Sequence, residues 1–305
     1  MEDVFIKPDE DLLDPKDDIV FKAMLTSNNE SSQKTLKHII SDFTGLKIEE
    51  VRVTENEPQT GSIEEKHLRL DVSCIFNGRE VAEVEMTMDA DKFEFTRVEY
   101  YLARLYSSAK TKGIKKYTDY PNAYQISIIG NRIVNKENED PISFYEFCDL
   151  KTKRPINGRM HIIITELKKL KEKKFEEMTA TEKWTAFFKW FADRSKADKL
   201  NKLIETEEAL KLATNALRYV SKDETTRRMI IQRDMARRDW DHKMACFEER
   251  GIAKGEQIGL EKGRAEMKIE REIEIARNML KRNYRIEDIA EDTGLSIEQI
   301  KALKQ

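Results

Sequence analysis

The sequence predicts an α/β domain followed by a helical C-terminal region. Apolar and polar residues alternate over residues 70–76 and 82–88, which is typical of strands, and a further strand pattern lies at 124–129. Beyond residue 184 strand signals are almost absent, and apolar residues recur at helical spacing instead. A chain of 305 residues can bury a substantial core in one to three domains.

The remaining elements are placed by their end signals and by periodicity. Helices are expected at 18–25 and 32–43, the second ending before Gly45, and a long helix at 93–112. A loop is expected at 56–65, which contains Pro58 and Gly61. Trp184, Phe187, Phe188 and Phe191 share a helical face, which predicts core packing. Three more segments carry strand signals: 48–53, 144–150 and 161–166.

The first two strand patterns flank Asn77-Gly78 and are expected to form a hairpin. A two-residue turn would set Asp71 opposite Val84 and place an acid beside the apolar row. A three-residue loop with a glycine bulge instead pairs Ile75 with Arg79, and the hydrophobic pattern selects this second register. One face of the hairpin is then apolar, and the other carries Asp71, Ser73, Glu83, Glu85 and Thr87.

The polar face of this hairpin offers two carboxylates for a metal. Asp71 and Glu85 are expected to lie one diagonal step apart, within roughly 7–8 Å. Carboxylates that close repel each other unless a cation lies between them, and Mg²⁺ prefers such oxygen ligands. A bound metal would suit phosphodiester hydrolysis. The alternative is an ordinary antiparallel sheet whose acids face solvent.

The arrangement of these acids before a long helix resembles the core of the PD-(D/E)XK nucleases. More narrowly, the order of short segments along the chain resembles the Rpn family of recombination-promoting nucleases and transposases. No single segment is specific, but their order is. The segments that carry the resemblance are 18–22, 69–72, 84–86, 97–106, 124–129, 162–167, 184–191 and 288–295.

The resemblance implies a restriction-endonuclease-like core, with a mixed sheet flanked by helices, and a metal-dependent DNA endonuclease linked to recombination or transposition. It implies Asp71 and Glu85 as ligands of Mg²⁺ or Mn²⁺, with the Met86 carbonyl completing the shell and Asp18 assisting from the first helix. DNA is the implied partner.

Thr87 departs from this family pattern. The usual residue two positions after the Glu is Lys, or often Gln, and a Thr cannot supply a cation to the attacking water or to the developing phosphorane charge. Either a basic residue from elsewhere reaches the site, or the chain is a weak or inactive nuclease-fold protein that binds DNA or assembles. The candidate cations are Lys22, Lys92, Arg97 and Arg104.

Composition limits the other possibilities. The net charge of −3 does not favour nucleic-acid binding, so DNA contacts would have to come from local basic runs, such as 110–116, 151–154, 168–174 and 227–238. The sequence has neither a long apolar run nor a signal-peptide pattern, so we expect a cytoplasmic protein, nucleoid-associated if it binds DNA, without a membrane span. The three Cys are widely spaced, which predicts reduced thiols and no zinc site.

Four regions are predicted: a nuclease-like domain at 1–170, a helical extension at 171–245, a glycine-striped helix or linker at 246–284, and a tail resembling a helix-turn-helix at 285–305. Glycines recur every four residues from Gly251 to Gly263. In a helix each glycine lowers the stability by about 1 kcal/mol relative to alanine. This glycine-striped segment is interpreted either as a linker or mobile helix, or as a self-association face through which the protein forms a homo-oligomer. In the tail, Ser296 is expected to cap a second helix after Gly294, in either a packing module or a DNA reader.

Overall fold

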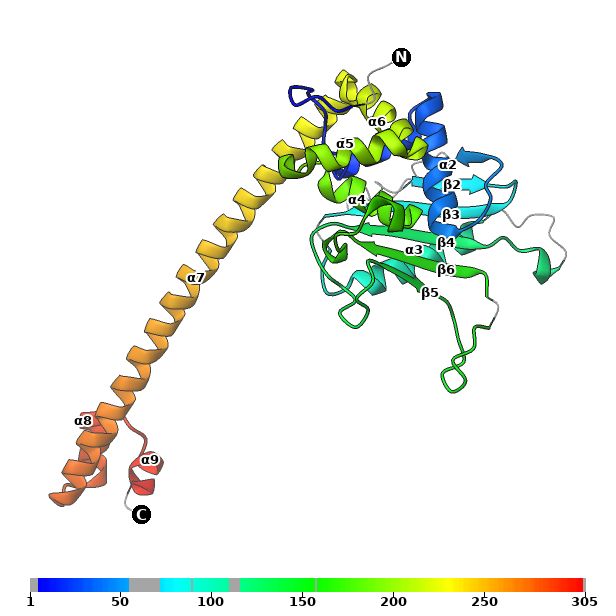
Figure 1. The fold of residues 1–305 in the computed structure, drawn as a ribbon. Coiled ribbons are helices and arrows are strands. Elements are labelled where there is room, and N and C mark those ends of the chain that lie inside the picture. The colour runs from blue at the N-terminus through cyan, green and yellow to red at the C-terminus, as the bar shows by residue number, and fades with distance from the viewer. Residues whose placement is uncertain (1–4, 55–71, 89, 110–115, 157, 304–305) are drawn as a thin grey trace. The chain divides into compact units, whose positions relative to one another are not determined.

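The computed structural model describes residues 5–54, 72–88, 90–109, 116–156 and 158–303 (Figure 1). Asp71 and the expected loop at 56–65 lie outside these residues. The contacts of the chain divide it into two compact units, Met1–Ile231 and Gln232–Gln305.

The described part of the first unit contains a six-stranded mixed sheet, as the sequence predicts (Figure 1). The middle strands β3, β4 and β6 are parallel, so their carboxyl ends meet at one edge of the sheet, and the other neighbouring pairs are antiparallel. In sheet order the strands are β1 (Val51–Val53), β2 (Val72–Phe76), β3 (Glu80–Thr87), β4 (Ala123–Ile129), β6 (Met160–Glu166) and β5 (Ile142–Tyr145).

Helices pack on both faces of this sheet. One face is covered by α3 (Glu94–Ser108), which connects β3 to β4 and contacts β3, β4 and β6. The other face carries the large hydrophobic core, to which the remaining helices of the unit contribute. These helices are α1 (Asp18–Thr26), α2 (Glu30–Thr44), α4 (Ala180–Trp190), α5 (Ala197–Thr206) and α6 (Glu208–Ser221).

The aromatic helix forms part of this core. A capping box begins α4, in which Thr179 and Glu182 exchange side-chain and backbone hydrogen bonds. Trp184, Phe187 and Phe188 are fully buried on one face of the helix. The packed aromatic face that the sequence predicts is therefore confirmed.

The hairpin of β2 and β3 has a different register from the predicted one. Ile75 pairs with Val81 rather than with Arg79, and the loop consists of residues 77–79. Asn77 and Gly78 both adopt positive φ angles, 47° and 80°, which closes the turn one residue later than expected. Because the shift changes the pairing by two residues, the apolar and polar side chains keep the faces that the alternation predicts.

The strand expected at 144–150 is also displaced. β5 spans Ile142–Tyr145 and pairs with β6 up to Ile162. Beyond Tyr145 the chain leaves the sheet as a narrow hairpin joined by an isolated bridge between Cys148 and Pro155. The apolar residues that suggested a strand, Phe147 and Leu150, are exposed there.

In the second unit, glycines 251 to 263 lie within α7 (Glu224–Lys281), a continuous helix. A Cβ atom at any of them would meet no described atom within 4 Å, so no other described segment approaches the stripe closely. Self-association through it stays a prediction.

The tail contains the two short helices that the sequence predicts, α8 (Ile286–Thr293) and α9 (Ile297–Ala302). Gly294 has the positive φ of a helix end, and Ser296 caps α9 through a capping box, as expected. Ile289 and Ile300 bury their side chains in one small cluster with Ala276 of α7, and both the packing module and the DNA reader stay predictions for this tail.

None of the described helices is long and apolar enough to cross a lipid bilayer.

Candidate active site

The acidic face of β3 is buried rather than exposed to solvent. Ala82 and Val84 contribute to the large core, whereas Glu83 and Glu85 lie on the face that α3 covers and are 1% and 2% exposed. The interpretation of these acids as ordinary solvent-facing residues is therefore excluded. Because burying an unpaired carboxylate is costly, each requires compensating partners.

Glu85 obtains its partners from α3 and from the neighbouring strand. Arg97 Nη2 donates a hydrogen bond to Glu85 Oε1 at 3.0 Å, and Nη1 approaches Oε2 at 3.4 Å. Ser127 lies opposite Glu85 in the parallel ladder and donates its hydroxyl to Oε1 at 3.1 Å. The carboxylate of Glu85 is thus held by charge-assisted bonds in a fixed orientation.

Arg97 also joins Thr87 and a third acid to this group. Its Nη2 lies 2.6 Å from Thr87 Oγ1 and 2.6 Å from Glu94 Oε1, and its Nε donates to Glu94 Oε2 at 3.3 Å. Glu94 is 3% exposed and precedes Arg97 by three residues, so both lie on one face of α3. We call Glu85, Thr87, Glu94, Arg97 and Ser127 the Arg97 cluster.

Electrostatics keep Arg97 charged. Burial of the guanidinium favours its neutral form and lowers the pKa of Arg97, but the hydrogen bond to Glu94 and the charges of Glu85 and Glu94 outweigh burial. The pKa of Arg97 is therefore raised, and Arg97 remains a cation between two carboxylates.

Tyr101 and Arg104 extend the same face of α3 by the next two turns. The guanidinium carbons of Arg97 and Arg104 lie 5.5 and 5.0 Å from the centre of the buried Tyr101 ring. Arg104 Nη2 lies 3.6 Å from Glu83 Oε1. Beside Glu83 in the ladder, the side-chain amide of Gln125 is buried without a hydrogen-bond partner among the described residues.

The four candidate cations differ in the contacts that their side chains make. Arg97 reaches Thr87 and Glu85, whereas Arg104 pairs with Glu83. Lys92 is exposed with its ammonium over the Phe93 ring, and Lys22 is half-buried on α1.

The structure also places two other predicted site residues, Asp18 and Met86. Asp18 begins α1, where its carboxylate accepts the Ile19 backbone N–H at 2.7 Å. Met86 pairs with Ile128 in the ladder, and its side chain lies in the large core. The roles of Asp18 and of the Met86 carbonyl stay predictions, as does that of Asp71.

Two residues of the cluster were missed from sequence. Glu94 could have been found from its spacing of three from Arg97 at the start of a helix. Ser127 carries no such signal, because its contact depends on the parallel register of β3 and β4.

Glu85 and Glu94 supply carboxylate oxygens, the type of ligand that a hard divalent cation prefers. Glu85 and Glu94 each place a carboxylate oxygen within 3.0 Å of the same Arg97 nitrogen, so one cation can lie near both acids. In the described part of the chain no three His, Cys, Asp or Glu side chains are grouped to hold a metal. A complete site would therefore need a further ligand, for which the sequence offers Asp71.

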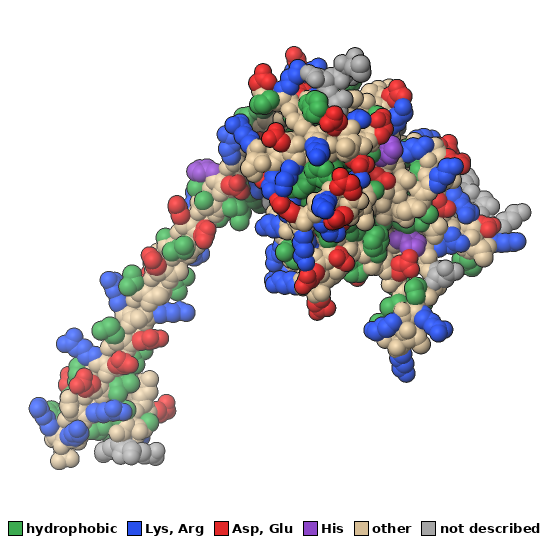
Figure 2. Space-filling model, viewed as in Figure 1, with side chains coloured by type: hydrophobic (Ala, Val, Ile, Leu, Met, Phe, Trp, Pro, Cys, Tyr) green, Lys and Arg blue, Asp and Glu red, His purple; other side chains and the backbone are tan. Residues whose placement is uncertain are grey.

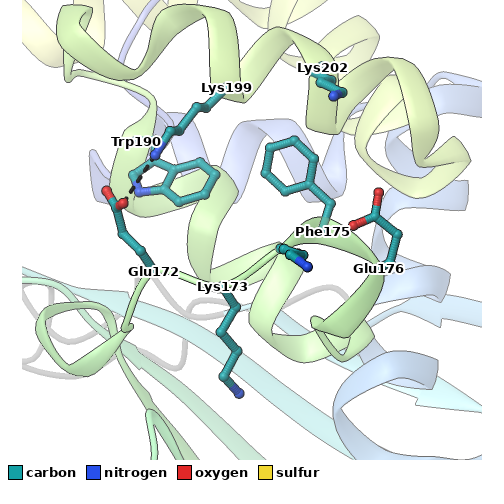
Figure 3. A pocket seen from close by; sticks show the side chains of 8 residues that line it. Glu172, Lys173, Phe175, Glu176, Trp190, Lys199 and Lys202 are labelled. Carbon is teal, nitrogen blue, oxygen red and sulfur yellow. Dashed lines mark hydrogen bonds and ion pairs between the residues drawn. The ribbon is translucent and has the colours of Figure 1, made fainter.

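An open pocket lies elsewhere in the first unit, beside the short 3₁₀ turn Phe175–Glu177 (Figure 3). Phe175 and Trp190 line it, and Lys202 places its ammonium 5.9 Å from the Phe175 ring centre. Lys199 on its rim is paired with Glu172 at 3.1 Å. Its lining residues do not belong to the Arg97 cluster.

The mixed sheet, its flanking helices and the helical C-terminal region are consistent with a PD-(D/E)XK nuclease fold. The family model described as PD-(D/E)XK nuclease family transposase matches residues 15–246, and the chain belongs to this family. Neither the curated proteins nor the solved structures gave a match.

Proposed function

We propose that this protein is a metal-dependent DNA endonuclease that hydrolyses phosphodiester bonds in recombination or transposition. The observation that carries the proposal is the position of Arg97, whose Nη2 lies 2.6 Å from Thr87 Oγ1 and 3.0 Å from Glu85 Oε1. A cation from α3 thereby lies beside Thr87, which occupies the position in β3 where the family pattern has Lys. In this proposal Arg97 would compensate for the departure at Thr87.

The residues of the cluster have distinct roles in this proposal. Glu85 would hold the metal together with Asp71 and the Met86 carbonyl, and Asp18 would assist. When bound, Mg²⁺ or Mn²⁺ would activate a water and polarise the phosphate.

Arg97 would donate to a non-bridging phosphate oxygen and stabilise charge that develops there. Thr87 accepts a hydrogen bond from Arg97 and fixes the direction of its guanidinium, while Ser127 orients Glu85.

A second function is favoured by a specific feature of the same cluster. Arg97 already neutralises Glu85 and Glu94, and a guanidinium that remains there competes with a metal for the same oxygens. In that case the protein would be a weak or inactive nuclease that binds DNA or assembles. The two functions differ in whether purified protein cleaves DNA in the presence of a divalent cation.

Nicking of supercoiled plasmid by purified protein in Mg²⁺ or Mn²⁺ tests the proposal. Asp71→Ala and Glu85→Ala should each lower the nicking rate at least about 100-fold, or roughly 2.7 kcal/mol of transition-state stabilisation. Glu83→Gln is the matched control on the same face of β3, and we expect it to lose less than about tenfold.

Equal nicking by the wild type and both alanine variants would exclude this site as the source of the activity. A wild type that binds DNA but does not nick it in either metal would favour the second function.

A further inference from the structure

The hairpin between β5 and β6 projects from the sheet (Figure 1), and we call its residues 146–156 the finger. Its two arms are joined by backbone hydrogen bonds, from Ile156 N to Phe147 O and from Asp149 N to Arg154 O, both 3.0 Å long. At the tip, Lys153 has a positive φ of 56° and donates its N–H to Asp149 O at 2.8 Å. The finger is therefore an ordered β-hairpin arm.

The tip is further stabilised by the side chain of Asp149. Its Oδ1 accepts the backbone N–H groups of Thr152 at 2.7 Å and Lys151 at 2.9 Å. The hydrogen bonds from Thr152, followed by that from Lys151, lower the pKa of Asp149. This acid serves the turn, which leaves the cations as the main charged groups directed to solvent.

The surface of the finger combines cations with exposed apolar side chains. All residues from Glu146 to Ile156 are exposed, and Leu150 at the tip reaches 79%. The side chains of Lys151, Lys153 and Arg154 have no ion-pair partner among the described residues. Figure 2 shows Lys and Arg side chains gathered at the end of the hairpin that follows β5 in Figure 1.

The base of the finger is fixed to the sheet. Glu146 pairs with His161 Nδ1 at 2.9 Å, and the His161 ring stacks on Tyr124 of β4 with centroids 4.6 Å apart. This end of β6 is its amino end, whereas Thr87 lies at the carboxyl end of the parallel strand β3. β6 has seven residues and therefore spans ~20 Å. Roughly six base pairs of duplex DNA have the same length, so the finger and the Arg97 cluster could contact separate stretches of one duplex.

We propose that the finger binds duplex DNA, with Lys151, Lys153 and Arg154 on backbone phosphates and Leu150 in the minor groove. This inference rests on the proposed function for its choice of ligand. The three cations complement phosphate, and an exposed apolar residue beside them is the combination with which architectural proteins enter the minor groove. The contact supplies affinity away from the reacting phosphate.

The test is binding of a fluorescein-labelled 30-base-pair duplex, followed by anisotropy in EDTA over a range of salt concentrations. The triple variant Lys151→Gln, Lys153→Gln, Arg154→Gln should bind at least about tenfold more weakly. Its slope of log affinity against log salt should fall by about 2.7, from three lost phosphate contacts. The triple variant Lys34→Gln, Lys47→Gln, Lys222→Gln changes the net charge equally elsewhere and should bind like the wild type.

Leu150→Ser provides an independent measurement. It should weaken binding several-fold without changing the salt slope, because an apolar contact releases no counterions. Both sets of substitutions lie on exposed side chains, so circular dichroism should show an unchanged fold. Affinity and slope equal to the wild type in the finger variants would overturn the inference.

Two further measurements separate this inference from the proposed function. DNA binding that depends on the finger, without plasmid nicking in Mg²⁺, would support the finger inference and refute the proposed nuclease function. Plasmid nicking together with DNA binding that does not depend on the finger would support the nuclease function and overturn the finger inference. The second measurement is binding to vesicles of 70% phosphatidylcholine and 30% phosphatidylglycerol. If the finger variants lose vesicle binding but bind DNA like the wild type, the finger is a membrane-binding segment and the inference is overturned.

Discussion

Removal of the Arg97 guanidinium should destabilise the protein, because this group is the counter-charge of two buried acids. Arg97→Met keeps a long side chain and deletes the charge that lies 3.0 Å from Glu85 and 2.6 Å from Glu94. Loss of one partner of a buried ion pair costs about 3–5 kcal/mol. Since the Arg97 side chain is 34% exposed, solvent screening reduces the expected loss to about 2–3 kcal/mol.

Urea unfolding followed by far-ultraviolet circular dichroism measures this loss. With an m-value of about 2.5 kcal/mol/M, the midpoint should fall by about 1 M. Lys92→Met is the matched control, since Lys92 is an exposed cation just before the same helix, and its midpoint should move little.

A double-mutant cycle isolates the interaction from the loss of packing. Glu94→Gln should destabilise the wild type but should be neutral or stabilising in the Arg97→Met background, where it removes an unpaired buried charge. The coupling free energy between the two positions should be about 1–3 kcal/mol. Millimolar Mn²⁺ should raise the midpoint more in Arg97→Met than in the wild type, because the metal then replaces the missing cation.

The reasoning would be refuted by an unchanged midpoint in Arg97→Met together with a coupling energy near zero. An equal effect of Mn²⁺ on both proteins would show that Arg97 and the metal do not share these carboxylates.

Three further outcomes are expected. Thr87→Lys should not raise plasmid nicking beyond about twofold, because Arg97 already lies 2.6 Å from Thr87 Oγ1; a tenfold gain would contradict this. Burial raises the pKa of Asp42 despite the hydrogen bond from Trp184 Nε1, so the folded state holds its proton more tightly and stability falls as pH rises above about 3.8. Asp42→Asn should remove that fall in urea midpoints between pH 3 and 7 and leave the low-pH midpoint unchanged. Phe188→Ala should cost about 3–5 kcal/mol in urea unfolding, since the ring is fully buried and stacked on Trp184; a loss below 1 kcal/mol would contradict its place in the core.

The sequence by itself determined the approximate positions of the strands β2, β3, β4 and β6 and of the helices α1, α2 and α4, and which of their side chains share a face. Alternation over β2 and β3 separated the apolar row from Glu83 and Glu85, because side chains of a strand point alternately to opposite sides. The spacing from Trp184 to Phe188 predicted a buried helical face, and Ser296 after Gly294 predicted a helix start. These features depend on the spacing of apolar residues and on the residue types at helix ends, both of which can be read from a short stretch of sequence.

Tertiary structure alone decided the rest. The two-residue shift between β2 and β3 preserves every face, so alternation cannot detect it, and the positive φ angles at Asn77 and Gly78 decided it. Burial of Glu85 depends on α3 folding over the sheet. The selection of Arg97 among four cations depends on that long-range packing too, because only the placement of α3 sets which guanidinium faces Thr87.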